Sequence, residues 1–165
     1  MAEGLTIRRA TAADAAALAG LLLPVFRAGD TYTVDPGIDA EGAVATWCAP
    51  EKTVFLAESG GVPLGTYYIR PNQGGGGAHV CNCGYVTAEA ARGRGVARAM
   101  LDHSLAEARA QGYRAMQFNF VVEANRRAVE TWTRAGFETV GRLPGAFRHP
   151  TQGYVDALVM FRSLV

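Results

Sequence analysis

Apolar and polar positions follow two spacings in the first third of the chain, one typical of strands and one typical of helices. Residues 5–10 alternate between polar and apolar side chains, which predicts a short strand. An alanine- and leucine-rich run follows, and we expect a helix that continues to about Pro24 or one turn beyond. Thr11 and Asp14 have the spacing of a capping box at its start. Residues 38–49 predict a second helix.

Three strands are expected in the middle of the chain. Residues 53–59 and 62–70 are rich in β-branched and aromatic side chains, and the two glycines between them are a hairpin signal. The glycine-rich residues 71–77 precede a strand instead of opening a helix, so they predict a hairpin tip and no phosphate site. Residues 78–86 form the third predicted strand.

The C-terminal half alternates between helices and strands. Residues 96–111 place apolar side chains at helical spacing and are followed by Gly112, a typical residue beyond a helix end. The remaining elements are expected to be a strand at 113–122, a helix at about 125–135, and strands at 137–143 and 153–164.

This order of elements predicts a single α/β domain over residues 1–165, without internal repeats or a linker. The sheet is expected to be mixed, because the crossovers through the two later helices favour parallel pairs of strands. A length of 165 residues is enough to bury a core, so the single-domain interpretation needs no second unit.

Composition narrows the class of protein further. Hydrophobic residues make up 49% of the chain and charged residues 19%, which argues against disorder. The net charge of +1 gives no electrostatic reason to expect nucleic acid or an acidic membrane as a partner. No secretory signal is visible, and the longest apolar run is too short to span a bilayer, so we expect a cytoplasmic protein without a membrane partner.

The three cysteines, Cys48, Cys81 and Cys83, lack the paired spacing of a structural zinc site. Alternation places Cys81 and Cys83 on one face of the third strand. We interpret them as buried free thiols and expect no metal site, with a redox or metal role as the alternative.

The segment Arg92-Gly93-Arg94-Gly95-Val96-Ala97 is the strongest chemical signal in the chain, because it follows a strand and opens a helix. A helix N-terminus presents backbone N–H groups without partners and carries a partial positive charge. Small residues let an anion come close, so a phosphate or pyrophosphate is the natural ligand. Neither the P-loop pattern nor the dinucleotide-binding pattern fits these residues.

Two patterns resemble motifs of the GCN5-related N-acetyltransferases, the GNAT superfamily. Residues 92–97 read R-x-x-G-x-A, like its acetyl-CoA pyrophosphate loop, and residues 125–137 read N-x-x-A-x-x-x-W-x-x-x-G-F, like its second motif. The predicted element order is also that of the superfamily. The resemblance implies a mixed, splayed central sheet with flanking helices, acetyl-CoA as co-substrate, and direct attack of an amine on the thioester in a ternary complex.

The resemblance also implies where acetyl-CoA lies. The sheet would open between the strand ending at Val86 and the strand containing Phe118, where the pantetheine arm pairs with backbone and the amides of residues 94–98 hold the pyrophosphate. Asn125 is at the same time a candidate N-cap of its helix. A homodimer is expected only from this family likeness. The implied cofactor-binding residues are Tyr85, Val86, Arg92, Gly93, Arg94, Gly95, Val96, Ala97, Arg98, Asn125 and Trp132.

Trp132 stands where the family motif has a tyrosine that is the proposed acid. An indole N–H donates a hydrogen bond but does not transfer a proton near neutral pH. We therefore expect Trp132 either to wall the cofactor channel or only to pack. The identity of the acid stays open, with Tyr85 and Tyr154 as weak candidates and release of the thiolate to water as the alternative.

Asn82 and Asn119 are amides inside apolar strands, where an unpaired amide is costly. Each is expected either to satisfy the splayed strand edge or to orient the substrate amine or the thioester carbonyl. The segments around them resemble the fungal and bacterial amine acetyltransferases that include the yeast proline-analogue N-acetyltransferase. This likeness implies a catalytic and substrate-binding role for Asn82 and Asn119, with Phe120 and Val121 beside them, and a small amine or amino acid as acceptor.

Neither the catalytic base nor the class of function is settled by the sequence alone. His79 is an alternative base, but alternation places it on the opposite face from Asn82. Arg148 and His149 are expected in a loop, which either meets a substrate carboxylate or is a plain surface loop. The rival functions are a catalytically silent acyl-CoA sensor and a protein N-terminal or lysine acetyltransferase.

Overall fold

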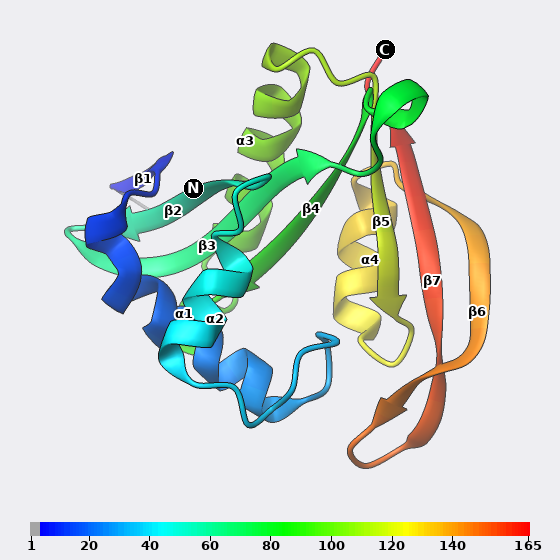
Figure 1. The fold of residues 1–165 in the computed structure, drawn as a ribbon, viewed down its shortest axis with the longest axis horizontal. Helices are drawn as coiled ribbons and strands as arrows, with labels where there is room; N and C mark the ends of the chain where they lie inside the picture. The colour runs from blue at the N-terminus through cyan, green and yellow to red at the C-terminus, as the bar shows by residue number, and fades with distance from the viewer. Residues whose placement is uncertain (1–3) are drawn as a thin grey trace.

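A computed structural model describes residues 4–165 as one seven-stranded sheet with helices on both faces (Figure 1). The order of the elements along the chain is the predicted one. The strands are β1 (Leu5–Arg9), β2 (Thr53–Ser59), β3 (Val62–Pro71), β4 (Val80–Thr87), β5 (Ala115–Val122), β6 (Glu138–His149) and β7 (Gly153–Ser163). The helices are α1 (Ala15–Ala28), α2 (Ala40–Trp47), α3 (Val96–Ala110) and α4 (Arg126–Arg134).

The strands lie in the order β1-β2-β3-β4-β5-β7-β6, and β4 and β5 form the one parallel pair among the described residues. This pair confirms the prediction of a mixed sheet. The prediction of a second parallel pair is wrong, because β7 inserts between β5 and β6 and runs antiparallel to both. The crossover through α4 therefore leads to a strand that is parallel to β5 but not its neighbour.

β4 and β5 separate soon after they meet. Their pairing is confined to Val80 with Ala115 and Cys81 with Met116, after which the two strands diverge (Figure 1). We call the region beyond these pairs the splay. It lies where the family resemblance implied, between the end of β4 and the second half of β5.

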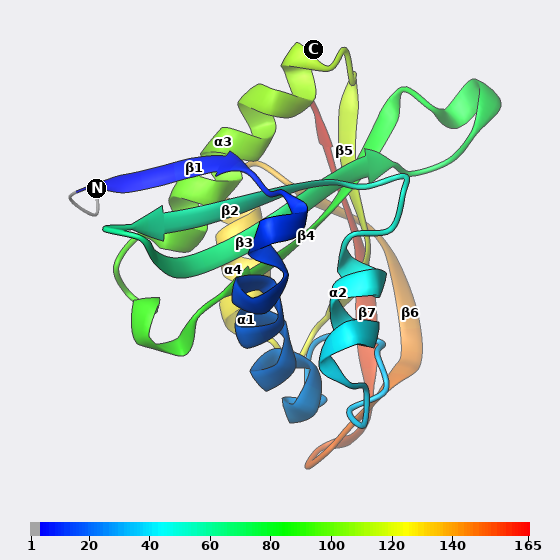
Figure 2. The same ribbon diagram turned by 60° about the vertical axis from the view of Figure 1, so that its left-hand side comes forward.

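The two faces of the sheet carry separate hydrophobic cores. Helices α1 and α2 cover one face, and α3 covers the other (Figure 2). Alternation along β4 sends Cys81, Cys83 and Tyr85 toward α3, and Asn82 and Val86 toward α1 and α2. The residues of β4 near the splay therefore alternate between the α3 face of the sheet and the face covered by α1 and α2.

The N-terminal helix begins and ends close to its predicted limits. The Thr11 N–H donates to the Asp14 carboxylate at 2.7 Å, within the predicted capping box, and a short 3-10 turn there leads into α1. The helix continues through Pro24 to Ala28, one turn beyond the proline. At the other end of the chain, Asn125 caps α4, because its side chain accepts from the Ala128 N–H at 3.3 Å.

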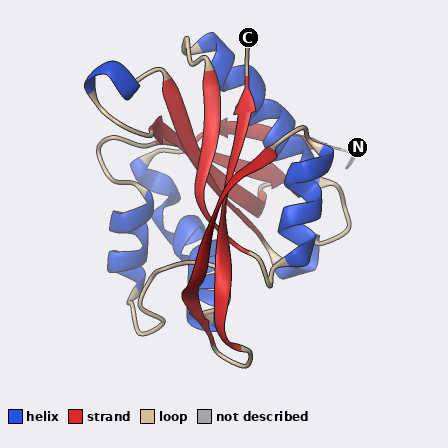
Figure 3. Ribbon diagram, turned by 90° about the vertical axis from the view of Figure 1, so that its right-hand side faces the viewer, coloured by secondary structure: helices blue, strands red, loops and turns tan. Residues whose placement is uncertain are grey.

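The β6–β7 hairpin is longer than predicted. Arg148 and His149 belong to β6 and pair with Tyr154 and Gly153, so the expected surface loop at these residues is wrong. The segment contains Pro144, a residue that is rare inside strands. The pairing is irregular between Leu143 and Phe147, and a proline is tolerated at such an irregularity on an edge strand. The hairpin projects from the body of the domain (Figure 3).

The cysteines follow the prediction in part. Cys81 and Cys83 are buried free thiols, whereas Cys48 is exposed. Within residues 4–165 no group of side chains has the composition and spacing of a metal site. None of the helices in that range is long and apolar enough to cross a membrane.

Candidate active site

The open edge of β4 in the splay is occupied by a side chain from the loop between α1 and α2. The Tyr32 hydroxyl accepts a hydrogen bond from the Tyr85 N–H at 2.9 Å and donates one to the Tyr85 carbonyl at 2.8 Å. Both backbone groups of Tyr85 therefore point into the splay, where the Tyr32 hydroxyl is their partner. The pairing of a pantetheine arm with backbone near Tyr85 and Val86, which the family resemblance implies, stays a prediction.

On the α3 and α4 side, aromatic rings line the splay. Trp132 lies 5.1 Å from the Tyr85 ring and 4.9 Å from the Phe118 ring, between centroids, so it spans from β4 to β5. Phe118 in turn stacks on Phe137 at 4.4 Å. Trp132 is half-buried, and both of its predicted roles, packing and forming a wall, are compatible with this position.

The N-terminus of α3 lies beyond the end of β4, where the predicted anion site belongs. Gly93 and Gly95 have φ angles of 77° and 79°, values that side-chain-bearing residues rarely adopt. The Arg94 N–H donates to the Ala91 carbonyl at 3.2 Å, so this amide has a partner within the chain. The amides of residues 96–98 have no acceptor within the helix, because they belong to its first turn.

The arginines around this helix end differ in their partners. Arg98 pairs with Asp102 one turn along α3 at 3.0 Å, and Arg92 lies 3.9 Å from Glu89. Both pairs are exposed and contribute little to stability. They leave the positive end of the helix as the main attraction for an anion.

Asn82 lies at the point where β4 and β5 separate. It is 6% exposed, and its amide nitrogen donates to the Gln117 carbonyl of β5 at 3.0 Å. Its amide oxygen accepts from the Arg70 Nε at 3.3 Å. The side chain thus replaces the backbone bond that the diverging strands no longer make, as one of the two interpretations of this residue predicted.

Asn119 lies on the same face of the sheet but farther along β5. Its amide nitrogen donates to the Asn72 side chain at 2.6 Å, and its oxygen accepts from the Gln117 amide at 2.9 Å. We call the five residues Arg70, Asn72, Asn82, Gln117 and Asn119 the polar cluster. The cluster connects three strands on the side of α1 and α2.

The structure does not bring the other two predicted substrate residues into the polar cluster. Phe120 packs against Phe147 of β6 with ring centroids 6.2 Å apart. Val121 is 8% exposed and belongs to the core on the α3 face, because the pairing of β5 is irregular between Phe118 and Val121.

Arg70, Lys52 and Tyr32 are polar residues at the site that the sequence did not single out. Lys52 lies over the Tyr68 ring at 4.4 Å, and its pKa is lowered first by burial and then by the charge of Arg70. The Tyr68 ring crosses β4 at Gly84, where a Cβ would lie 2.6 Å from a ring carbon. Arg70 is brought to the site by its position opposite Asn82, and the sequence alone does not show which residues of β3 and β4 lie opposite each other.

None of the candidate acids and bases named from the sequence lies in the splay as an accessible proton donor. Burial raises the pKa of the Tyr85 phenol, which bonds Ser104 at 2.8 Å on the α3 side. Tyr154 is 74% exposed on the β6–β7 hairpin, and His79 is exposed just before β4 begins. His103 of α3 forms a 2.5 Å hydrogen bond with the buried Tyr67.

Comparison with known proteins assigns this architecture to a family. The family profile described as Acetyltransferase (GNAT) family matches residues 24–137, more than half of the chain. The chain belongs to the GNAT family. The matched range contains the polar cluster, the aromatic residues of the splay and the N-terminus of α3.

Known structures and sequences agree with this GNAT assignment. A GCN5-related N-acetyltransferase from Kribbella flavida is 41% identical, with 98% of each chain covered and a TM-score of 0.91. A GNAT superfamily phosphinothricin acetyltransferase from Sinorhizobium meliloti, solved with AcCoA, shares the fold at 18% identity and a TM-score of 0.84, with 97% of this chain and 88% of that chain covered.

The N-acetyltransferase aca1 of Schizosaccharomyces pombe is 33% identical over 97 residues, which are 58% of this chain. The match covers 46% of that protein, so this chain accounts for about half of its length.

Proposed function

We propose that this GNAT domain transfers an acetyl group from acetyl-CoA to the amine of a small molecule. The amine nitrogen attacks the thioester carbon, the C–S bond breaks, CoA leaves as a thiolate, and the amine gives up its proton to solvent. The observation that carries the proposal is the β4 edge at Tyr85, which has lost β5 as its neighbour and lies in line with the N-terminus of α3 beyond the same strand. An extended amide chain and a pyrophosphate fit these two features in that order.

The residues present suit acetyl-CoA in three places. The first-turn amides of α3, preceded by Gly93 and Gly95, suit the pyrophosphate. The backbone of Tyr85 offers a donor and an acceptor to the pantetheine arm, and Trp132 offers an apolar wall beside it. Val86 follows Tyr85 in β4, and Asn125 caps the helix that carries Trp132.

The acceptor amine is proposed to enter on the opposite side, against the polar cluster. Asn82 and Asn119 supply neutral hydrogen-bonding groups, and Asn82 lies at the point where the strands part. Arg70 is half-buried and has no carboxylate partner within residues 4–165. The carboxylate of an acceptor could therefore form an ion pair with its guanidinium group. This arrangement favours an amino acid or a close analogue over a basic peptide, which would need acidic residues there.

Two measurements test the proposal. Acetyl-CoA is expected to raise the melting temperature, and a panel of amines is expected to include at least one that releases free CoA. The panel pairs each amino acid with its carboxamide and includes peptides with free N-termini and lysines. Stabilisation without CoA release would support the acyl-CoA sensor, and release by peptides alone would support a protein acetyltransferase. Absence of any stabilisation would refute the proposal.

A further inference from the structure

The two hydrogen bonds between Tyr32 and Tyr85 join a loop to a strand edge that has lost its neighbour. Buried backbone N–H and C=O groups are almost always paired in folded proteins. Past Cys81, β5 no longer supplies the partners for β4. One hydroxyl satisfies both groups of Tyr85, because it accepts from the N–H at 2.9 Å and donates to the carbonyl at 2.8 Å.

Tyr32 is held in this position by packing as well as by its hydroxyl. Its ring centroid lies 5.5 Å from that of Phe26 in α1 and 5.8 Å from that of Trp47 in α2, both in edge-on geometry. Burial raises the pKa of the Tyr32 phenol, so the hydroxyl keeps its proton throughout the neutral range and remains both donor and acceptor.

A pantetheine arm would form hydrogen bonds with the same two backbone groups of Tyr85. Each of its secondary amides carries one carbonyl acceptor and one N–H donor, the pair that the Tyr32 hydroxyl combines in one atom. The Tyr85 N–H donates well to only one acceptor at a time. The hydroxyl and the arm therefore cannot both occupy this edge.

We propose that the Tyr32 hydroxyl is an internal competitor that acetyl-CoA displaces from the Tyr85 backbone when it binds. The inference rests on the proposed function, since it takes acetyl-CoA as the ligand of the splay. It also goes beyond that function, because it assigns Tyr32 an opposing effect on cofactor affinity. A residue that simply contacted the cofactor would strengthen binding, whereas this hydroxyl weakens it.

The Tyr32→Phe variant separates the two possibilities. The phenyl ring keeps the contacts with Phe26 and Trp47, but the Tyr85 N–H and carbonyl lose their partner in the free protein. Binding of acetyl-CoA would then restore those bonds without displacing anything. Titration calorimetry is expected to show acetyl-CoA binding about tenfold tighter than in the wild type, the gain for relieving unpaired buried groups.

Two controls localise the effect. Adenosine 3′,5′-bisphosphate lacks the pantetheine arm, so its affinity is expected to be the same in Tyr32→Phe and wild type. Tyr113→Phe removes a hydroxyl just before β5, at the end where β4 and β5 are still paired, and is expected to change neither affinity. Equal or weaker acetyl-CoA binding by Tyr32→Phe would overturn the inference alone. A wild type that binds no acetyl-CoA would refute the proposed function, and the inference with it.

A measurement on the wild type keeps the test independent of how the variant folds. The ¹³Cζ signal of a tyrosine responds to the hydrogen bonds of its hydroxyl. In protein labelled at this carbon, the Tyr32 signal is expected to move as acetyl-CoA saturates, and the Tyr113 signal is expected to stay. A Tyr32 signal that does not move at saturation would show that the hydroxyl remains on Tyr85 and would contradict the inference.

Discussion

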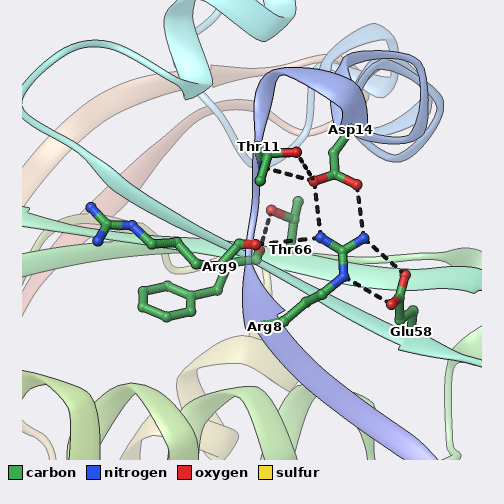
Figure 4. A network of polar contacts seen from close by, with 7 residues as sticks. Arg8, Arg9, Thr11, Asp14, Glu58 and Thr66 are labelled. Atoms are coloured by element: carbon green, nitrogen blue, oxygen red, sulfur yellow. Dashed lines mark hydrogen bonds and ion pairs between the residues drawn. The ribbon is translucent and has the colours of Figure 1, made fainter.

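Two arginines on the same sheet differ in the charge of their hydrogen-bond partners. Arg8 of β1 lies between two carboxylates, with its nitrogens 2.8 Å from Asp14 and 2.9 Å from Glu58 (Figure 4). Arg70 of β3 donates to the amide oxygen of Asn82 at 3.3 Å and has no carboxylate partner within residues 4–165. The first group is a closed network of charges, and the second leaves a positive charge beside neutral amides.

The difference separates a polar group that holds the fold from one that is suited to a ligand. In the closed network, Asp14 also accepts from the Thr11 N–H at the start of the first helical turn, so every charge is used within the chain. In the polar cluster, the amides of Asn82 and Asn119 hold the two strands together at the splay, but Arg70 forms no ion pair with any of residues 4–165. We infer that substitutions in the first group change stability and that substitutions in the second change turnover or substrate affinity.

The largest effect is expected from Asn82→Ala. Loss of this amide removes a preorganised hydrogen-bonding group next to the proposed reaction centre, and kcat is expected to fall about 100-fold or more. The affinity for acetyl-CoA is expected to stay close to that of the wild type, as measured by calorimetry. Glu58→Gln, a loss of charge in the closed network, is the control and is expected to leave kcat unchanged. Full activity of Asn82→Ala would remove Asn82 from the acceptor site.

Arg70→Gln is expected to act on the acceptor instead of on the chemical step. Hydrogen bonds to charged groups contribute about 1.5–3 kcal/mol, so KM for an amino acid acceptor is expected to rise about tenfold or more. KM for the matching carboxamide is expected to change little, because it offers no negative charge. Steady-state kinetics with both acceptors makes the comparison, and Arg8→Gln is the control. An equal rise for both acceptors would show that Arg70 does not recognise a carboxylate.

The sequence predicted most of the fold because strand alternation and helix spacing are local properties. Alternation correctly placed Cys81 and Cys83 on one face of β4, and the structure shows that Asn82 lies on the other face, the polar side of the splay. Arg70 was missed because only the register of β3 against β4 places it opposite Asn82.

Two other features were not predicted because they also depend on tertiary contacts. Tyr32 lies in a loop without periodicity, and its role appears only when the loop folds across β4. The extension of β6 through Pro144 was missed because the local composition favours a turn, while pairing with β7 overrides that preference.

Two glycines at opposite ends of α3 extend the comparison to the backbone. Gly95 precedes the helix with a φ of 79°, and Gly112 follows it with a φ of 85°. Alanine at either position costs about 1–2 kcal/mol in the left-handed region, so similar losses of melting temperature are expected. Only Gly95→Ala is expected to weaken acetyl-CoA binding, by about fivefold, since it shifts the first-turn amides. Equal affinities in the two variants would argue against an anion site at this helix end.

The smallest effect is expected from the closed network under acid. Hydrogen bonding to Arg8 holds the pKa of Asp14 well below its usual range. A depressed carboxyl pKa stabilises the fold above the unfolded value of about 3.9 and loses that contribution as pH falls below it. Asp14→Asn is therefore expected to have a lower urea midpoint than the wild type at pH 6, with the two curves converging toward pH 2. A constant difference across this range would show that the ion pair contributes nothing measurable.

A crystal structure of the complex with acetyl-CoA would locate the cofactor and the Tyr32 hydroxyl together. We expect the pyrophosphate to lie at the N-terminus of α3 and the pantetheine arm to pair with Tyr85 in place of Tyr32. The acetyl group should then reach the point where β4 and β5 separate, with Trp132 on one side and Asn82 and Arg70 on the other. An acetyl group bound outside the splay, with the Tyr32 hydroxyl still on the Tyr85 backbone, would contradict this expectation.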